Sequence, residues 1–135
     1  MLKSFLQWLA ITVTSFGALG GGTHAYLSAY PTRVLVVLDT SFPMQSSWAE
    51  AAAALQALRE RPYSEFSLYT EKGVVHGWQP GLALRSITPY APRDWSKLDT
   101  IRNSRESADA TEVILITNDK AYAGVPSGWE VQRLN

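Results

Sequence analysis

The first 30 residues differ sharply in charge from the rest of the 135-residue chain. They contain no Asp or Glu and one basic residue, Lys3, although the whole chain holds 12 acidic and 12 basic side chains. Residues 5–27 are mostly apolar, with hydroxyl side chains and glycines between the large hydrophobic ones. This contrast predicts an N-terminal membrane segment over residues 1–29 and a globular domain over residues 31–135.

Residues 5–27 predict a membrane-targeting helix, because roughly 20 helical residues cross a bilayer core. We expect an uncleaved, single-pass signal anchor in the cell membrane, with Lys3 inside and the C-terminal domain outside the cytoplasm. The alternatives are a signal peptide cleaved after Ala25, which gives a secreted protein, and a buried soluble helix. Gly17 and Gly21 have small-xxx-small spacing, so a homodimer through this helix is a further possibility.

Composition excludes several kinds of chemistry. The formal net charge of zero argues against a nucleic-acid partner. The chain has no Cys, which excludes disulfides, a thiol nucleophile and Cys-ligated metal sites. Of its two histidines, His76 falls within an expected strand and is predicted to be structural.

Two continuous apolar runs of strand length, residues 33–39 and 112–117, are typical of parallel strands that are buried on both faces. The other expected elements are a helix over 48–61 with a capping box from Ser47 to Glu50, a β-hairpin over 65–70 and 74–78 closed at Gly73, short helices over 81–87 and over 96–107 with Ser96 as a cap, and an edge strand over 129–134. Trp48 and Trp78 are expected to pack near the sheet. Together, the expected strands and helices predict an α/β, Rossmann-like fold with a mostly parallel sheet and a β-hairpin at its edge.

Polar residues follow both buried strands. Asp39 ends the first run, Ser41 follows it, and Asn118 and Asp119 follow the second. If the two strands are neighbours, these side chains converge at the carboxyl edge of the sheet, where α/β folds bind ligands. Their oxygens suit Mg²⁺, Mn²⁺ or Ca²⁺. The alternative is that they only cap the turns that follow the strands.

The order of elements from residue 33 to 118 resembles a von Willebrand factor A (vWA) domain. It runs from a strand ending in Asp39-Thr-Ser41, through a helix, a hairpin and a helical segment, to a strand ending in Ile116-Thr-Asn118. In that family an Asp-x-Ser-x-Ser motif, a Thr from a second loop and a later Asp form the metal-ion-dependent adhesion site. The chain is shorter than a full vWA domain and lacks a helix–strand pair near its end.

The resemblance implies metal ligands at Asp39, Ser41 and Asn118, with Asp94 or Ser96 in the region of the second loop. Pro43 stands where the family has its second Ser, and Asn118 stands where it has an Asp. The resemblance therefore implies a degenerate adhesion site, with weak or absent Mg²⁺ or Mn²⁺ binding.

The segments around 37–41 and 114–120 also resemble the opening and closing motifs of PIN-type nucleases. That resemblance implies metal ligands at Asp39 and Asp119, with Glu60 as a third, for phosphodiester hydrolysis. The hairpin lies where that family is helical, and the chain is neither basic nor expected in the cytoplasm.

These observations predict a membrane-anchored, vWA-like module that binds a protein partner and does not catalyse a reaction. Its ligand face would be formed by the loops after Asp39, near Asp94 and after Thr117. Trp95 and Trp129, if exposed, would extend this partner-binding surface. The alternatives are the metal-dependent nuclease and a non-catalytic structural subunit of a membrane complex.

Overall fold

The computed structural model describes residues 2–83 and 87–135. The chain divides into two compact units, Met1–Pro31 and Thr32–Asn135.

The first unit is one long helix, α1 (Leu2–Ala29), in which no residue is buried. Large hydrophobic side chains are exposed along its length; they include Leu2, Phe5, Leu6, Trp8, Leu9, Ile11, Val13, Phe16 and Leu19. Near its end the rings of Tyr26 and Tyr30 pack 4.9 Å apart. Among the residues that the structure describes, no helix combines the length and the apolar character needed to cross a membrane.

The second unit is built on a mixed, mostly parallel sheet of five strands in the order β3-β2-β1-β4-β5. The central strand β1 (Thr32–Leu38) lies parallel to β2 (Ser64–Thr70) and to β4 (Glu112–Thr117). β5 (Glu130–Arg133) is parallel to β4, and β3 (Gly73–Gln79) is antiparallel to β2. The predicted α/β fold, with a mostly parallel sheet and a hairpin at its edge, is therefore confirmed.

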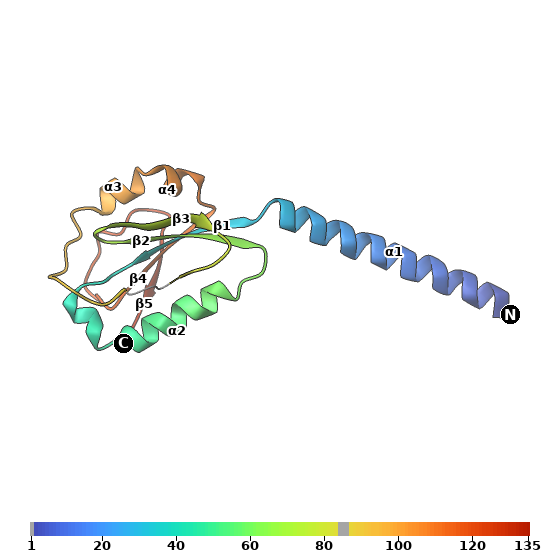
Figure 1. Ribbon diagram of the computed structural model, residues 1–135, viewed down its shortest axis with the longest axis horizontal. Coiled ribbons are helices and arrows are strands. Elements are labelled where there is room, and N and C mark those ends of the chain that lie inside the picture. Colours follow the sequence, from blue (N-terminus) through green and yellow to red (C-terminus); the bar gives the residue numbers. More distant parts are fainter. Residues whose placement is uncertain (1, 84–86) are drawn as a thin grey trace. The chain divides into compact units, whose positions relative to one another are not determined.

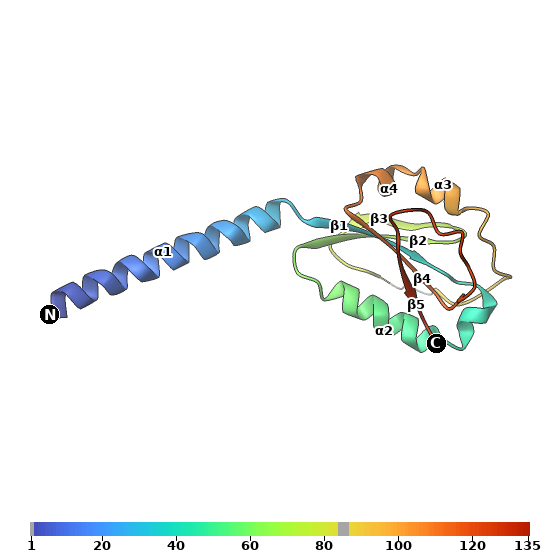
Figure 2. The ribbon, with the colours of Figure 1, turned by 180° about the vertical axis from the view of Figure 1, so that it is seen from behind.

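Helices cover both faces of this sheet (Figures 1 and 2). α2 (Trp48–Arg59) packs on one face, against alternate residues of β1 such as Val36 and Leu38. α3 (Leu98–Arg102) lies on the other, where Leu98 and Ile101 are buried in the same cluster as Leu35 and Val37, and α4 (Arg105–Asp109) follows it on that side. Apolar side chains thus point to both faces of the central strands, as the continuous runs predicted. The side chains on the α2 face, such as Val36 and Leu38, form the α2-side cluster, and those on the α3 face, such as Leu35 and Val37, form the α3-side cluster. Trp48 packs against the first cluster and Trp78 against the second, also as predicted.

The capping-box hydrogen bonds predicted between Ser47 and Glu50 at the start of α2 are wrong. Ser47 is the N-cap residue but makes no side-chain capping bond. Its hydroxyl donates instead to the Asn135 carbonyl at 2.7 Å, and Glu50 accepts the Asn135 N–H at 3.0 Å. The reason is tertiary: Leu134 is buried in the α2-side cluster, which brings Asn135 to the start of α2.

The helical predictions after the hairpin were less accurate. Of the helix expected over 81–87, residues 84–86 lie outside the described part, and the described flanks are not helical. The helix expected over 96–107 is split into α3 and α4. Ser104, not Ser96, acts as a cap, because its hydroxyl accepts the Ser107 N–H at 3.1 Å. The short 3₁₀ helix η1 (Phe42–Gln45) was not predicted.

Candidate functional site

Asp39 is the buried centre of the polar residues at the carboxyl ends of the strands. It is fully buried immediately after β1, and its backbone N–H donates to the Ile116 carbonyl of β4 at 2.9 Å. Its Oδ1 accepts the Ser41 N–H at 3.0 Å, and its Oδ2 accepts the Thr117 hydroxyl at 2.7 Å. Because β1 and β4 are neighbours, their polar ends converge as the sequence predicted.

Arg93 supplies the positive charge beside Asp39. Its Nε donates to Asp39 Oδ2 at 2.9 Å, its Nη2 donates to Asn118 Oδ1, and its Nη1 lies 3.5 Å from Asp119 Oδ2. The Arg93 side chain is 19% exposed and that of Asp39 is fully buried. One guanidinium therefore bridges the ends of β1 and β4, and charge-assisted bonds of this kind are among the stronger hydrogen bonds in proteins.

A fixed loop holds Arg93 in this place. Tyr90 N–H donates to the Thr40 carbonyl at 2.7 Å, and Phe42 N–H donates to the Ala91 carbonyl at 2.9 Å. Ala91 has a φ of +66°, a left-handed conformation that costs a non-glycine residue about 1 kcal/mol or more. The two backbone bonds on either side of Ala91 stabilise this conformation and fix the approach of Arg93.

The two residues after β4 are also fully engaged. Asn118 Nδ2 donates to the Pro43 carbonyl at 2.7 Å and to Ser47 Oγ at 3.1 Å. Asp119 accepts the backbone N–H groups of Ala121 and Tyr122 and the Trp95 indole N–H. Burial alone would raise the pKa of Asp119, but these hydrogen bonds and the charge of Arg93 outweigh it and hold that pKa below its usual range.

These contacts test whether the residues fit the metal site that the vWA resemblance implies. Both oxygens of Asp39 already accept hydrogen bonds, and a guanidinium lies against the same Asp39 and Asn118 oxygens that would bind the cation. Within residues 2–83 and 87–135, Ser41 Oγ is buried and has no hydrogen-bond partner. With Arg93 in place, these residues do not fit a divalent cation, because the guanidinium occupies the position of the cation and its positive charge would repel one.

The structure does not bring the other predicted ligands into this cluster. Asp94 and Ser96 are exposed, and Asp94 Oδ1 accepts the Ser96 N–H at 2.9 Å. The hydrogen bonds from Ser96 lower the pKa of Asp94. Glu60 lies at the end of α2, a few residues before β2 begins beside Thr32. Glu60 is therefore near the amino ends of the parallel strands, whereas Asp39 and Asp119 follow their carboxyl ends.

The two tryptophans considered as partner-binding residues are half-buried. Trp95 and Trp129 both pack against the α3-side core cluster. Trp95 also stacks on the Tyr122 ring, with the ring centres 4.8 Å apart and the planes inclined by 25°. Trp95 and Tyr122 thus connect the loop that carries Arg93 to the loop after β4.

A second polar cluster lies at the turn between β2 and β3. The Glu71 side chain is fully buried, and its Oε2 accepts the Thr40 N–H at 2.8 Å. The Lys72 ammonium pairs with Glu71 Oε1, donates to Thr40 Oγ1 at 3.0 Å and lies 4.3 Å from the centre of the Tyr90 ring. Glu71 and Lys72 therefore hold the start of the Arg93 loop against the hairpin.

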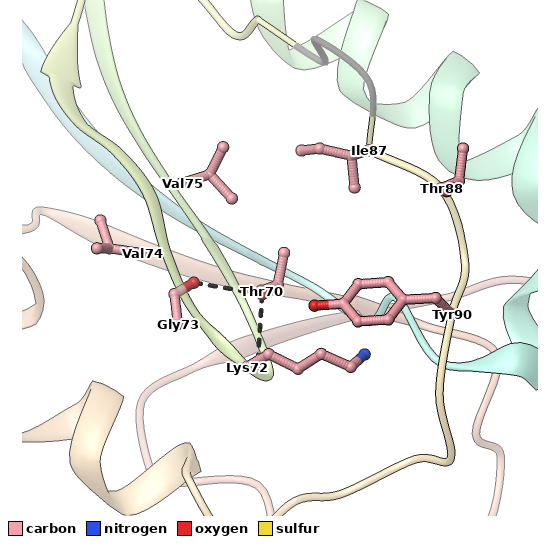
Figure 3. Close-up of a pocket in the computed structure, with 8 residues that line it drawn as sticks. All are labelled: Thr70, Lys72, Gly73, Val74, Val75, Ile87, Thr88 and Tyr90. Carbon is pink, nitrogen blue, oxygen red and sulfur yellow. Dashed lines mark hydrogen bonds between the residues drawn. The ribbon is translucent and has the colours of Figure 1, made fainter.

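Lys72 also borders a shallow cleft of about 310 Å³ between the hairpin and the segment from Ile87 to Tyr90 (Figure 3). The other residues that line it are Thr70, Gly73, Val74, Val75 and Thr88. Because Lys72 already has Glu71, Thr40 and the face of Tyr90 as partners, we assign it a structural role in this cleft.

No pattern in the sequence points to Arg93, Glu71 or Lys72 as site residues. Arg93 follows Pro92 in a loop broken by prolines, and Glu71-Lys72 forms the turn of a hairpin, where charged residues are usually solvated. Their partners lie far away in the chain: 54 residues separate Arg93 from Asp39, and 31 separate Glu71 from Thr40. The only local signal was that Asp39 follows a buried strand and so needs a nearby cation if it is charged.

No family model, curated protein or solved structure matches this chain.

Proposed function

We propose that this chain is a membrane-held binding module of vWA-like fold that contacts a protein partner and does not catalyse a reaction. The partner-binding surface would be formed by the loops at the carboxyl ends of β1 and β4. The observation that carries the proposal is the bridge from Arg93 to Asp39, Asn118 and Asp119. It orders three loops before any partner arrives, and such pre-organisation lowers the entropic cost of binding.

The vWA-like assignment rests on the strand order and on the place of the Asp39–Ser41 segment. That segment follows the central strand β1, and Asn118 follows the neighbouring strand β4. Because Arg93 neutralises this edge in place of a divalent cation, we propose that Mg²⁺ and Mn²⁺ bind weakly or not at all.

The same bridge speaks against the nuclease alternative. A metal-dependent nuclease needs free carboxylates that hold a metal against the phosphate. Asp39 and Asp119 both pair with Arg93, and Glu60 lies near the opposite, amino ends of the strands. The arrangement therefore supports binding rather than hydrolysis.

A titration with a parallel hydrolysis assay tests this proposal. Calorimetry of the detergent-solubilised full chain with Mg²⁺ or Mn²⁺ should give no binding heat at millimolar metal, for the wild type and for Asp39→Ala. The same samples should leave labelled RNA and DNA intact in Mn²⁺. Metal binding that is lost in Asp39→Ala, or cleavage that is lost in Asp119→Ala, would contradict the proposal.

We further propose that residues 5–27 of α1 hold the chain at the cell membrane as a single pass, with the second unit outside the cytoplasm. α1 falls short of the apolar character usual for a membrane span, so the support for this proposal is its exposed large hydrophobic side chains together with the absence of acidic residues. Trp8 and Tyr26 lie 18 positions apart, about 27 Å along a helix at about 1.5 Å per residue. That spacing is close to the thickness of a bilayer core, roughly 30 Å, and so is consistent with aromatic rings near both interfaces.

Alkaline carbonate extraction tests the anchor. The full chain should remain in the membrane pellet, whereas a variant with Ile11→Asp and Phe16→Asp should be released, because charged side chains are costly in lipid. Val74→Asp, at an exposed position of β3, is the matched control and should remain in the pellet. Two results would contradict an uncleaved anchor: release of the wild type from the pellet, or a mass spectrum that shows a purified chain beginning at Tyr26.

A further inference from the structure

The outer edge of β3 has no strand beside it. In the part of the chain that the structure describes, β3 ends the sheet, with β2 on one side and no strand on the other. Its seven residues, GVVHGWQ, include no Asp, Glu, Lys or Arg. Val74 is 60% exposed and Val75 is 41% exposed. A strand at the edge of a sheet that carries no charged side chain is a template for pairing with another strand.

The opposite edge of the sheet is built differently. β5 is only four residues long, and two of the four are the exposed charged residues Glu130 and Arg133. Short length and charged side chains are the usual features that keep an edge from pairing. β5 is thus short and charged, whereas β3 is longer and uncharged, although its pairing with β2 is irregular at two places. Of these two edges, β3 is the better suited to meet a partner.

We propose that β3 pairs antiparallel with β3 of a second copy of this chain, so that two five-stranded sheets become one continuous sheet. A two-fold axis brings the same strand from each copy together in antiparallel orientation. The inference goes beyond the proposed function and does not depend on it, because β3 lies at the side of the sheet and not among the loops around Arg93.

The chemistry of β3 favours its own copy as the occupant. Neither strand contains Asp, Glu, Lys or Arg, so two copies meet without repulsion between such side chains. The nearest lysine, Lys72, is already paired with Glu71. Figure 3 shows Val74 and Val75 pointing to opposite sides of β3, so valines are available for cross-strand contacts on both faces of a joined sheet. Antiparallel pairing also continues the pattern that β3 has with β2.

Cysteine cross-linking tests this proposal. Because the chain has no Cys, a single introduced thiol can form a disulfide only with the same position of a second copy. Single cysteines at Val74, Val75, His76 and Gly77 are compared with a control cysteine at Val131 of β5, using the detergent-solubilised full chain oxidised with copper phenanthroline. At least one β3 position should give mainly a disulfide-linked dimer, because a disulfide needs Cα atoms within about 7 Å. The β5 control should stay monomeric.

A charge at the edge then separates strand pairing from pairing through α1. In the His76→Cys background, Val74→Lys should reduce the cross-linked fraction at least tenfold, whereas Val74→Thr should leave it unchanged. Val75→Lys repeats the test at a second exposed position, and circular dichroism confirms that each variant is folded. The proposal is wrong if no β3 cysteine forms a dimer, if the β5 cysteine cross-links equally well, or if neither lysine has an effect.

Discussion

Replacing Arg93 with Ala is expected to lower the free energy of unfolding by about 3–5 kcal/mol. The substitution leaves the fully buried Asp39 carboxylate without its cation and removes the bonds to Asn118 and Asp119. Small domains have only about 5–15 kcal/mol of stability, so this variant should lie close to its unfolding threshold. Urea denaturation of the full chain in detergent, followed by tryptophan fluorescence, measures the change.

Arg105→Ala is the matched control for Arg93. The Arg105 side chain is 89% exposed and lies 3.6 Å from Asp109 one turn away on α4, an arrangement that contributes little. Its loss should change the free energy of unfolding by about 0.5 kcal/mol or less. If Arg93→Ala lowered the free energy of unfolding no more than Arg105→Ala does, the hydrogen bonds and ion pairs of Arg93 would not contribute to stability as proposed.

Replacing Lys72 with Met is expected to cost about 3 kcal/mol, since the fully buried Glu71 side chain then has no positive partner. The double variant Glu71→Gln with Lys72→Met should recover most of this loss, because the amide keeps an acceptor for the Thr40 N–H without an unpaired charge. Thermal and urea unfolding of both variants measure the difference.

Lys97→Met is the control for Lys72, because Lys97 is exposed: its ammonium donates to the Lys72 carbonyl at 3.4 Å, and its charge acts on the exposed Asp94. It should be nearly neutral. A double variant that is less stable than Lys72→Met alone would show that Glu71 contributes to stability in some way other than through its charge pair.

The sheet could be predicted because its signals are local and strong. Residues 33–39 and 112–117 are apolar runs of strand length, which suit strands buried on both faces, and the hairpin is closed at Gly73. Gly73 has a φ of +153°, a conformation that L side chains rarely adopt. The short helices could not be predicted as well, because their starts depend on competing turns. Asp94 takes the Ser96 N–H, and Ser104 is the residue that caps α4.

The candidate site was predictable in place but not in composition. Asp39, Asn118 and Asp119 converge because parallel neighbouring strands end at the same edge of a sheet. Sequence patterns suggested that these oxygens form a degenerate site that binds a divalent cation weakly or not at all. The structure instead places the Arg93 guanidinium there, from a loop whose position is set by backbone bonds to Thr40 and Phe42. Such a partner cannot be found from spacing along the chain.

We propose that Arg93, and not a divalent cation, neutralises Asp39. A double-mutant cycle of Asp39→Asn and Arg93→Met, measured by urea denaturation in EDTA, tests it most directly. We expect a coupling free energy of about 2 kcal/mol or more, and a wild-type stability that millimolar Mg²⁺ leaves unchanged. A coupling near zero in EDTA, or a wild type that Mg²⁺ stabilises, would contradict the account.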